Sequence, residues 1–229
     1  MISPLEKARK DPDSMKAKIL KAARRIFGEY GFHGTTTRLI ARETGIDIST
    51  LHYHWGDKAN LYEAVILDIT DDLKNELAEV EKVIHGLPLA RRMDIAIDMV
   101  TDYLFERPEI SNLILFRYFG KTRHEALVDF HMPEFVSDIA RSMHLSESSK
   151  HVPVNAKMKV LAMMNAIYNF ISGEEFFRSM LKLPKGDYVS MVKETLKFIL
   201  IPAFTSGGRE YRAGPAAEGG RIDREGGDG

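Results

Sequence analysis

The apolar residues of this chain recur every three or four positions, which is the spacing of one face of a helix. The first run follows Asp13 or Ser14, either of which can cap the start of a helix, and it stops at Gly31. Its apolar positions are Ile19, Ala22, Ala23, Ile26, Phe27 and Tyr30. Further runs of the same period follow as far as residue 204, so the pattern predicts an all-α protein.

Two short helices are predicted next, joined by a tight turn. Thr36 or Thr37 can cap the first, which must stop at Gly45 because glycine adopts a left-handed conformation at little cost. Asp47 can cap the second, which runs over about residues 48–54. A helix of about seven residues is not stable alone in water, so neighbouring helices must hold both. This arrangement is typical of a helix-turn-helix, whose second helix enters the major groove of DNA.

The second of these helices carries more hydrogen-bonding groups than a buried helix needs. Its apolar anchors are Ile46, Ile48, Leu51 and Trp55, and its polar side chains are Ser49, Thr50, His52, Tyr53 and His54. Hydroxyl groups and imidazole nitrogens suit phosphate oxygens and base edges, although an ordinary polar surface helix would show the same pattern. A metal site is not expected, since His52 and His54 are two positions apart and point away from each other.

A further helix is predicted to begin after Asp57. Lys58 lies in its first turn, where a lysine opposes the positive end of the helix dipole. Free N–H groups and a lysine together bind phosphate well, so this position favours an anionic partner. The apolar face of this helix consists of Leu61, Tyr62, Val65 and Ile69.

Spaced residues between Ile19 and Ile66 form a pattern that extends well beyond a single short motif. They are Ala22, Ala23, Phe27, Gly31, Phe32, Thr36, Thr37, Ile40, Ala41, Gly45, Leu51, Tyr53, His54, Trp55, Lys58 and Leu61. This pattern resembles the N-terminal DNA-binding domain of the TetR family of bacterial transcriptional regulators. The resemblance implies that Arg38 reads a guanine and that Lys58 contacts phosphate. The residues expected to contact DNA are Thr36, Thr37, Arg38, Ser49, Thr50, His52, Tyr53, His54 and Lys58.

This chain departs from the family pattern at several positions near the expected DNA surface. Trp55 replaces the usual phenylalanine as a larger anchor of the core. His52 replaces a common tyrosine or tryptophan, which leaves the base preference there open. Ile48 stands where lysine or serine is frequent, and Asp47 places a carboxylate near the DNA. These two residues would either weaken phosphate binding or serve folding alone.

The charge of the chain is unevenly distributed. A net charge of −1 at pH 7 excludes a strongly basic protein that coats nucleic acid. Residues 1–58 hold 11 Lys and Arg against 7 Asp and Glu, whereas the remainder holds 21 against 26. A basic N-terminal part on an acidic body fits a specific DNA binder.

Several classes of protein are disfavoured by what the sequence lacks. The chain contains no cysteine, which excludes disulfides and a thiol nucleophile. No apolar run resembles a signal peptide or approaches the roughly 18 residues of a membrane helix, so we expect a soluble, cytoplasmic protein. No phosphate-binding loop, carboxylate pair or Ser/His arrangement indicates an enzyme, and no cofactor is expected.

The sequence divides into parts of different character. Residues 1–13 are expected to form a flexible basic arm, and residues 14–60 the helix-turn-helix domain. Residues 61–204 are expected to bind an effector and dimerise, with a helix over about 57–85 that joins both domains. Residues 205–229 hold 8 of the 17 glycines and almost no large apolar residues, so this tail is expected to be disordered.

Two long apolar helices are predicted at the C-terminal end, over about 154–181 and 186–204. They carry more apolar surface than one face of a small domain needs, and methionine and aromatic residues are favoured at interfaces. The resemblance implies a homodimer built from these helices, which would bind a palindromic operator; the alternative is that they form intramolecular core. The expected interface residues are Phe176, Phe177, Met180, Met191, Leu196 and Ile199.

Large apolar residues of the middle helices are numerous enough to line a ligand cavity. The candidates are Tyr103, Phe116, Phe119, Phe130, Met164 and Tyr168. A stripe of this kind more often forms ordinary core, but the resemblance implies a small apolar or amphipathic effector. The remaining histidines lack the spacing of metal ligands.

These features predict a homodimeric, ligand-responsive DNA-binding transcriptional regulator, and such regulators are more often repressors than activators. Two alternatives stay open. One is an architectural or division-related DNA binder of the same fold without a metabolite effector. The other is an all-α ligand carrier, or an enzyme, whose helix-turn-helix is incidental.

Overall fold

The computed structural model describes residues 3–119, 132–146 and 151–205, and only the backbone of Phe119 and Met132. Helices are the only regular elements within these ranges, which confirms the all-α prediction. Their bounds are α1 Pro4–Lys10, α2 Met15–Gly34, α3 Thr37–Thr44, α4 Ile48–Trp55, α5 Lys58–Ile84, α6 Leu89–Glu106, α7 Pro108–Phe119, α8 Met132–Ser142, α9 Val154–Ser172, α10 Glu174–Leu181 and α11 Lys185–Thr205. Except for Thr205, the tail that was predicted to be disordered lies outside the described residues.

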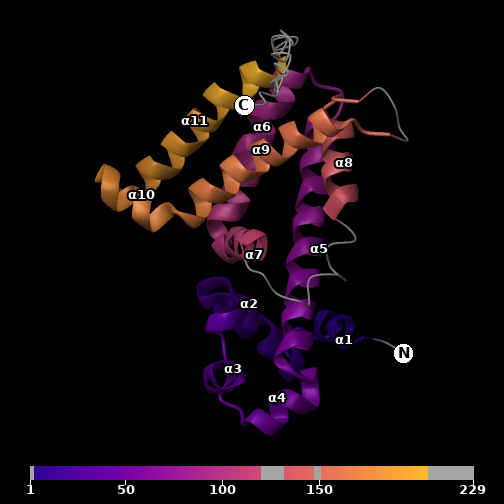
Figure 1. Cartoon of the computed structure of the whole chain (residues 1–229), viewed down its shortest axis with the longest axis vertical. Coiled ribbons are helices and arrows are strands. Elements are labelled where there is room, and N and C mark those ends of the chain that lie inside the picture. The colour runs from indigo at the N-terminus through magenta and orange to yellow at the C-terminus, as the bar shows by residue number, and fades with distance from the viewer. Residues whose placement is uncertain (1–2, 120–131, 147–150, 206–229) are drawn as a thin grey trace, which may run out of the picture.

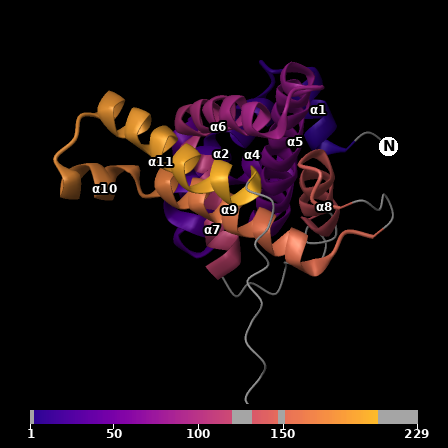
Figure 2. The same ribbon diagram turned by 90° about the horizontal axis from the view of Figure 1, so that it is seen from above.

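The long helix α5 runs through most of the length of the molecule (Figure 1). Helices α1 to α4 gather around its first half, and α6 to α11 lie beside and beyond its second half. Seen from above, α10 and the start of α11 project away from the other helices (Figure 2). The chain thus forms an N-terminal helix-turn-helix unit followed by a larger helical part, as the sequence predicted.

A buried core holds the short helices of the N-terminal part. Leu51 of α4 is fully buried, and the indole N–H of Trp55 donates to the backbone oxygen of Lys16 in α2 at 3.3 Å. Ile40 of α3 and Phe27 of α2 complete this core without any exposed surface. These neighbours supply the stability that a helix of 8 residues lacks on its own. Trp55 therefore fills the core in the way that the sequence predicted.

The predicted flexible arm instead contains a short helix, α1. Ser3 and Glu6 form a capping box in which each side chain accepts the backbone N–H of the other residue. Ala8 is buried, and Arg9 donates to Asp68 and Asp71 of α5 at 2.9 and 3.0 Å. Local capping and these ion pairs hold α1 against α5, although the composition of this segment predicted a flexible arm.

Helices α2 and α7 approach each other closely, which joins the N-terminal part to the rest. A methyl group on Gly28 would lie 2.5 Å from the Cβ of Glu109 in α7. Gly31 has a φ of +66°, which breaks the helical path of α2 where the sequence predicted its end. The ring of Phe116 covers Gly31. The missing side chain of Gly28 lets α7 lie this near to α2.

The predicted helix over about 154–181 is divided into α9 and α10 at Gly173. A side chain at Gly173 would meet the ring of Phe177, since a methyl group there would lie 2.4 Å from it. Further along the chain, the hydroxyl of Tyr188 in α11 donates to the backbone oxygen of Phe170 at 2.8 Å. This bond and the fully buried Leu196 fix α11 against α9 and α6.

Candidate nucleic-acid interface and ligand cavity

The turn of the helix-turn-helix begins with two local caps on α3. The hydroxyl of Thr36 accepts the N–H of Leu39 at 3.2 Å, which satisfies one free donor at the start of the helix. Gly45 ends the helix with a φ of +69°, and its N–H bonds back to Arg42 at 3.2 Å. Between these caps Arg38 is exposed, at the position where the resemblance places a base contact.

Asp47 forms the cap of α4. Its Oδ1 accepts both the hydroxyl of Ser49 and the N–H of Thr50, each at 2.6 Å. These bonds, first that of Ser49 and then that of Thr50, hold the pKa of Asp47 below its usual value. Of the two roles that the sequence left open for Asp47, the structure supplies the one in folding.

The residues predicted to contact DNA share one end of the molecule but differ in exposure. Tyr53 has 84% of its surface exposed. The exposed residues are Thr36, Arg38, Ser49, His52 and Tyr53, and the half-buried ones are Thr37, Thr50, His54 and Lys58. The exposed set presents a guanidinium, an imidazole and hydroxyl groups, all of which can bind phosphates or base edges.

The imidazole of His52 is fixed by a bond within its own helix end. Its Nδ1 lies 2.6 Å from the backbone oxygen of Gly56. A carbonyl oxygen only accepts, so Nδ1 carries the proton of this bond. In the neutral ring Nε2 is then a hydrogen-bond acceptor that faces solvent, which matches the amino group of adenine or cytosine.

His54 has the opposite arrangement, which the sequence did not reveal. Lys16 of α2 donates to the backbone oxygen of His54 at 2.8 Å, and its Nζ lies 3.2 Å from Nδ1 of the same residue. An ammonium group only donates, so Nδ1 accepts and Nε2 of His54 carries the proton. Burial and then the charge of Lys16 lower the pKa of His54, which favours this neutral form. The two imidazoles of α4 thus differ in tautomer, since Nε2 is an acceptor in His52 and a donor in His54.

Lys58 makes contacts that the sequence did not predict. Its Nζ donates to the backbone oxygens of Phe32 and Thr35 at 2.9 and 3.0 Å and lies 4.2 Å from the centre of the Phe32 ring. A cation is favourable there because carbonyl groups at the end of α2 carry partial negative charge. Lys58 therefore joins α2 to α5, and its contact with phosphate stays a prediction.

A cavity of about 590 Å³ lies among α5, α6, α8 and α9. This volume is within the range of sites for small organic molecules. Of the candidates from the sequence, Met164 and Tyr168 line it. Phe130 lies outside the described residues, and the side chain of Phe119 is not described.

Two of the predicted lining residues lie elsewhere, and we correct them here. Tyr103 lies beside the guanidinium of Arg107, which is 4.6 Å from the centre of its ring. Phe116 lies against Gly31 of α2 and so belongs to the contact between α7 and α2. The size and apolar character of a side chain predict that it is buried, but they do not distinguish the wall of a cavity from a contact between helices.

Most of the cavity wall comes from residues that the sequence did not single out. The wall residues of α5 and α8 include Leu73, Leu77, Val80, Phe135 and Ile139. The signal available for them was the apolar stripe of α5, which continues beyond the N-terminal part to Ile84. Helix spacing alone could not show that this stripe faces an open space.

Several large apolar side chains of α10 and α11 are exposed. Phe176, Met180, Met191 and Ile199 of the predicted interface are exposed, and Phe177 is half-buried. The prediction that Leu196 lies in the interface is wrong, because its side chain is fully buried inside the chain and cannot contact a partner. Phe198 was missed: it is 80% exposed on the same helix.

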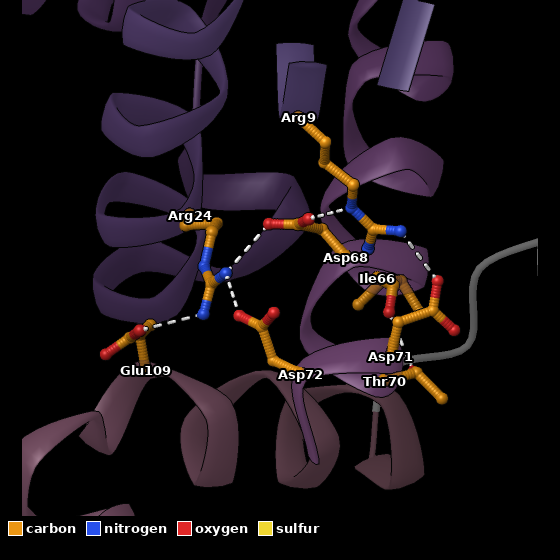
Figure 3. A network of polar contacts seen from close by, with 8 residues as sticks. All are labelled: Arg9, Arg24, Ile66, Asp68, Thr70, Asp71, Asp72 and Glu109. Carbon is orange, nitrogen blue, oxygen red and sulfur yellow. Dashed lines mark hydrogen bonds and ion pairs between the residues drawn. The ribbon is translucent and has the colours of Figure 1, made fainter. Parts of the chain in front are cut away.

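Ion pairs join α1, α2, α5 and α7 where the two parts of the chain meet (Figure 3). Arg24 of α2 points toward three acidic side chains, with Asp68 and Asp72 on α5 and Glu109 on α7. The distance from Nη1 of Arg24 to Oδ2 of Asp68 is 2.7 Å, and the other oxygen of Asp68 accepts from Arg9. Asp68 is buried, so these bonds offset the cost of removing its charge from water.

Two further features are absent from the described ranges. None of the helices there is both long and apolar enough to cross a membrane. Among the same residues no three histidine, aspartate or glutamate side chains gather as metal ligands would.

The fold and the exposed side chains of α4 are those of a helix-turn-helix DNA-binding domain. Residues 19–65 match the family model of bacterial regulatory proteins of the tetR family. The chain is 33% identical over 90 residues to the HTH-type transcriptional regulator UidR of Escherichia coli K12, covering 39% of this chain and 44% of UidR. It is 39% identical over 54 residues to the HTH-type transcriptional repressor AcnR of Corynebacterium glutamicum, covering 24% of this chain and 29% of AcnR. These matches span less than half of either relative.

The match to another relative and to solved structures extends further. AcnR of Corynebacterium diphtheriae is 27% identical over 143 residues, which cover 61% of this chain and 71% of AcnR. A transcriptional regulator of Rhodococcus sp. RHA1 has the same fold, with a TM-score of 0.60 at 13% identity, over 83% of this chain and 97% of that one. The structure of AibR in complex with isovaleryl coenzyme A and operator DNA has a TM-score of 0.60 at 15% identity, over 80% and 96% of the two chains. Residues 19–65 of this chain therefore match a DNA-binding domain of the tetR family, and the chain shares the fold of these solved regulators over most of its length.

Proposed function

We propose that this protein is a homodimeric repressor that leaves a palindromic operator when a small apolar or amphipathic effector fills the cavity. One observation carries the proposal: a single helix serves both sites. Leu73 and Leu77 of α5 line the cavity, while Asp68 and Asp72 of the same helix hold Arg24 of α2. Because its target would be DNA, we expect the protein to act in the cytoplasm.

The proposed dimer is supported by the exposed apolar side chains of α10 and α11. Phe176, Met180 and Phe198 are 68%, 60% and 80% exposed, which is unusual for a monomer. A second copy placed on this surface would bury them around a two-fold axis. Two recognition helices related by that axis would meet half-sites one helical turn or a multiple of it apart.

The proposed release of the operator is a shift between two populated arrangements. A ligand that favours a different position of α5 would pull on the ion pairs at Asp68 and Asp72, and Arg24 would transmit the movement to α2. Lys16 of α2 bonds to α4, so the recognition helix would follow. The helices α3 and α4 of each copy form its reading head. A displacement of each reading head by a few ångströms is enough to lose the match to successive grooves of the DNA.

The relatives agree with this proposal in their own functions. AcnR is named as a repressor, and the structure of AibR contains isovaleryl coenzyme A together with operator DNA. In that neighbour one protein of this fold binds both kinds of molecule. We extend the same pair of functions to this chain.

The direct test is selection of DNA sequences by the full-length protein, followed by measurement of affinity by fluorescence anisotropy. We expect a palindromic site, and Arg38→Ala should weaken binding by about tenfold or more, as loss of a specific arginine contact does. Arg91→Ala, which changes an exposed arginine of α6, is the matched control and should bind normally. Unselective binding by the wild-type protein, unaffected by Arg38→Ala, would refute the proposal and favour an architectural DNA binder.

A further inference from the structure

Four charged side chains line the cavity, two of each sign, and of these only Arg92 and Glu81 pair with each other. Lys74 and Arg92 carry positive charge, and Glu81 and Asp138 carry negative charge. Lys74 and Asp138 are exposed, whereas Arg92 has only 7% of its surface exposed. Arg92 is therefore the one charged group well placed inside the wall, and its partners decide what it can offer a ligand.

Arg92 is already engaged by groups of the protein. Its Nη2 donates to both carboxylate oxygens of Glu81 at 3.0 and 3.1 Å and to the hydroxyl of Ser142 at 3.0 Å. Its Nη1 lies 3.4 Å from Nδ1 of His144. Ser142 in turn donates to Glu81 at 2.6 Å, which closes a small network. The guanidinium and its carboxylate thus neutralise each other at this end of the cavity.

An anionic ligand would disturb this network. Its carboxylate would have to share Arg92 with Glu81, at a distance where two like charges repel strongly in a medium of low dielectric constant. The carboxylate of the ligand would also have to leave water for a wall that consists mainly of apolar side chains. The cost falls on the charged form of a ligand and not on an uncharged one.

Tyr168 supplies a polar group that the protein leaves unused. The residue lines the cavity and is only 4% exposed. Among the described residues its hydroxyl forms no hydrogen bond, so this donor is available to a ligand. Burial raises the pKa of Tyr168, so the group keeps its proton and can donate it to an oxygen.

We propose that the cavity binds an uncharged organic molecule with a mainly apolar body and one oxygen that accepts a hydrogen bond from Tyr168. The proposal rests on the proposed function only in taking this cavity as the effector site. Ketones, esters and lactones of moderate size have this chemistry. Carboxylates and phosphate esters do not.

A matched pair of fluorescent probes tests this assignment on the full-length protein. The first is 6-propionyl-2-(dimethylamino)naphthalene, an uncharged ketone, and the second is 6-(dimethylamino)-2-naphthoate, a carboxylate on the same ring system. We expect the ketone to bind with a blue-shifted emission and the carboxylate to bind at least about tenfold more weakly. No binding of the ketone, or tighter binding of the carboxylate, would overturn the proposal.

Variants locate the bound ketone. Tyr168→Phe keeps the ring and removes the hydroxyl, so it should weaken ketone binding by about fivefold, the value of one neutral hydrogen bond. Ala96→Phe fills the cavity from α6 and should abolish binding, while Ala90→Phe on the exposed side of that helix should not change it. Circular dichroism spectra confirm that each variant is folded. Equal affinity of Tyr168→Phe and wild type would contradict the assigned contact.

The outcome is separable from that of the proposed function because the probes are titrated without DNA. Ketone binding together with no selected DNA site would leave the ligand class standing and refute the repressor. A selected DNA site together with preference for the carboxylate would leave the reading head standing and refute the ligand class.

Discussion

The two ends of α5 differ in how they are packed. At the N-terminal end Leu61, Val65 and Ile69 are buried in close contact with neighbouring helices, and Lys58 bonds to carbonyl groups of α2. At the C-terminal end the helix forms one wall of a cavity of about 590 Å³, with Leu77 only half-buried. In the proposed mechanism a ligand would move the second end at low cost, and the closely packed first end would transmit the movement because it cannot yield locally.

The largest expected effect is on stability, and it tests whether the two ends differ in packing. Leu61→Ala should lower the free energy of unfolding by about 3 kcal/mol, because it empties a filled core. Leu77→Ala should cost only about 1 kcal/mol, because that side chain already lacks neighbours on the cavity side. Urea denaturation followed by circular dichroism measures both values. Equal losses would show that the cavity wall is packed like the core.

The next effect concerns the ion pairs that connect α2 to α5. Arg24→Met should cost about 3 kcal/mol, since it leaves Asp68 and Asp72 without their shared partner. Arg9→Met should cost less than about 1 kcal/mol because its side chain is 38% exposed. In anisotropy measurements, operator affinity of Arg24→Met should no longer respond to the cavity ligand. A normal response would remove this network from the proposed mechanism.

A smaller effect is expected for the anchor at the start of α5. Lys58→Met keeps the length of the side chain and removes its bonds to Phe32 and Thr35, at a cost of about 1–2 kcal/mol. Lys21→Met, at an exposed lysine of α2, is the control and should be neutral. The salt dependence of operator binding gives a second reading. If Lys58→Met reduces the slope of log affinity against log salt concentration by about one unit, Lys58 also makes the phosphate contact that the sequence predicted.

The smallest effect concerns base selection. His52→Phe should reduce discrimination at one base pair by about 1 kcal/mol, because it removes the acceptor at Nε2. Affinity for non-specific DNA should stay the same. Operators with single base substitutions measure the difference, and the affected pair should carry an adenine or cytosine amino group. Uniform weakening across all substitutions would mean that His52 contacts the backbone only.

The reading head could be predicted from the sequence because it is built by local rules. Thr36, Gly45 and Asp47 act within a few residues of their own positions, so their identity and spacing suffice. The bonds of Lys16 and Lys58 could not be predicted. Each joins segments more than 20 residues apart, and only the packed structure brings them together.

The cavity and the apolar surface were predicted in kind but not in detail. Met164 and Tyr168 line the cavity, but Phe116 lies against α2 and Leu196 is buried within the chain. Helical spacing identifies an apolar face without showing what covers it. The helix α1 was not predicted although the capping box of Ser3 and Glu6 is local; the contact of Arg9 with Asp68 on a distant helix adds to it and could not be read from the sequence.

The central claim is that filling the cavity moves the reading heads through α5. The chain has no cysteine, so Lys21→Cys introduces a single spin-label site on an exposed position of α2 in each copy of a dimer. Double electron–electron resonance then measures the distance between the two labels. With the ketone probe bound, as its emission shows, we expect that distance to shift by a few ångströms, the scale of helix movements in such transitions. An unchanged distance distribution at saturation would contradict the account.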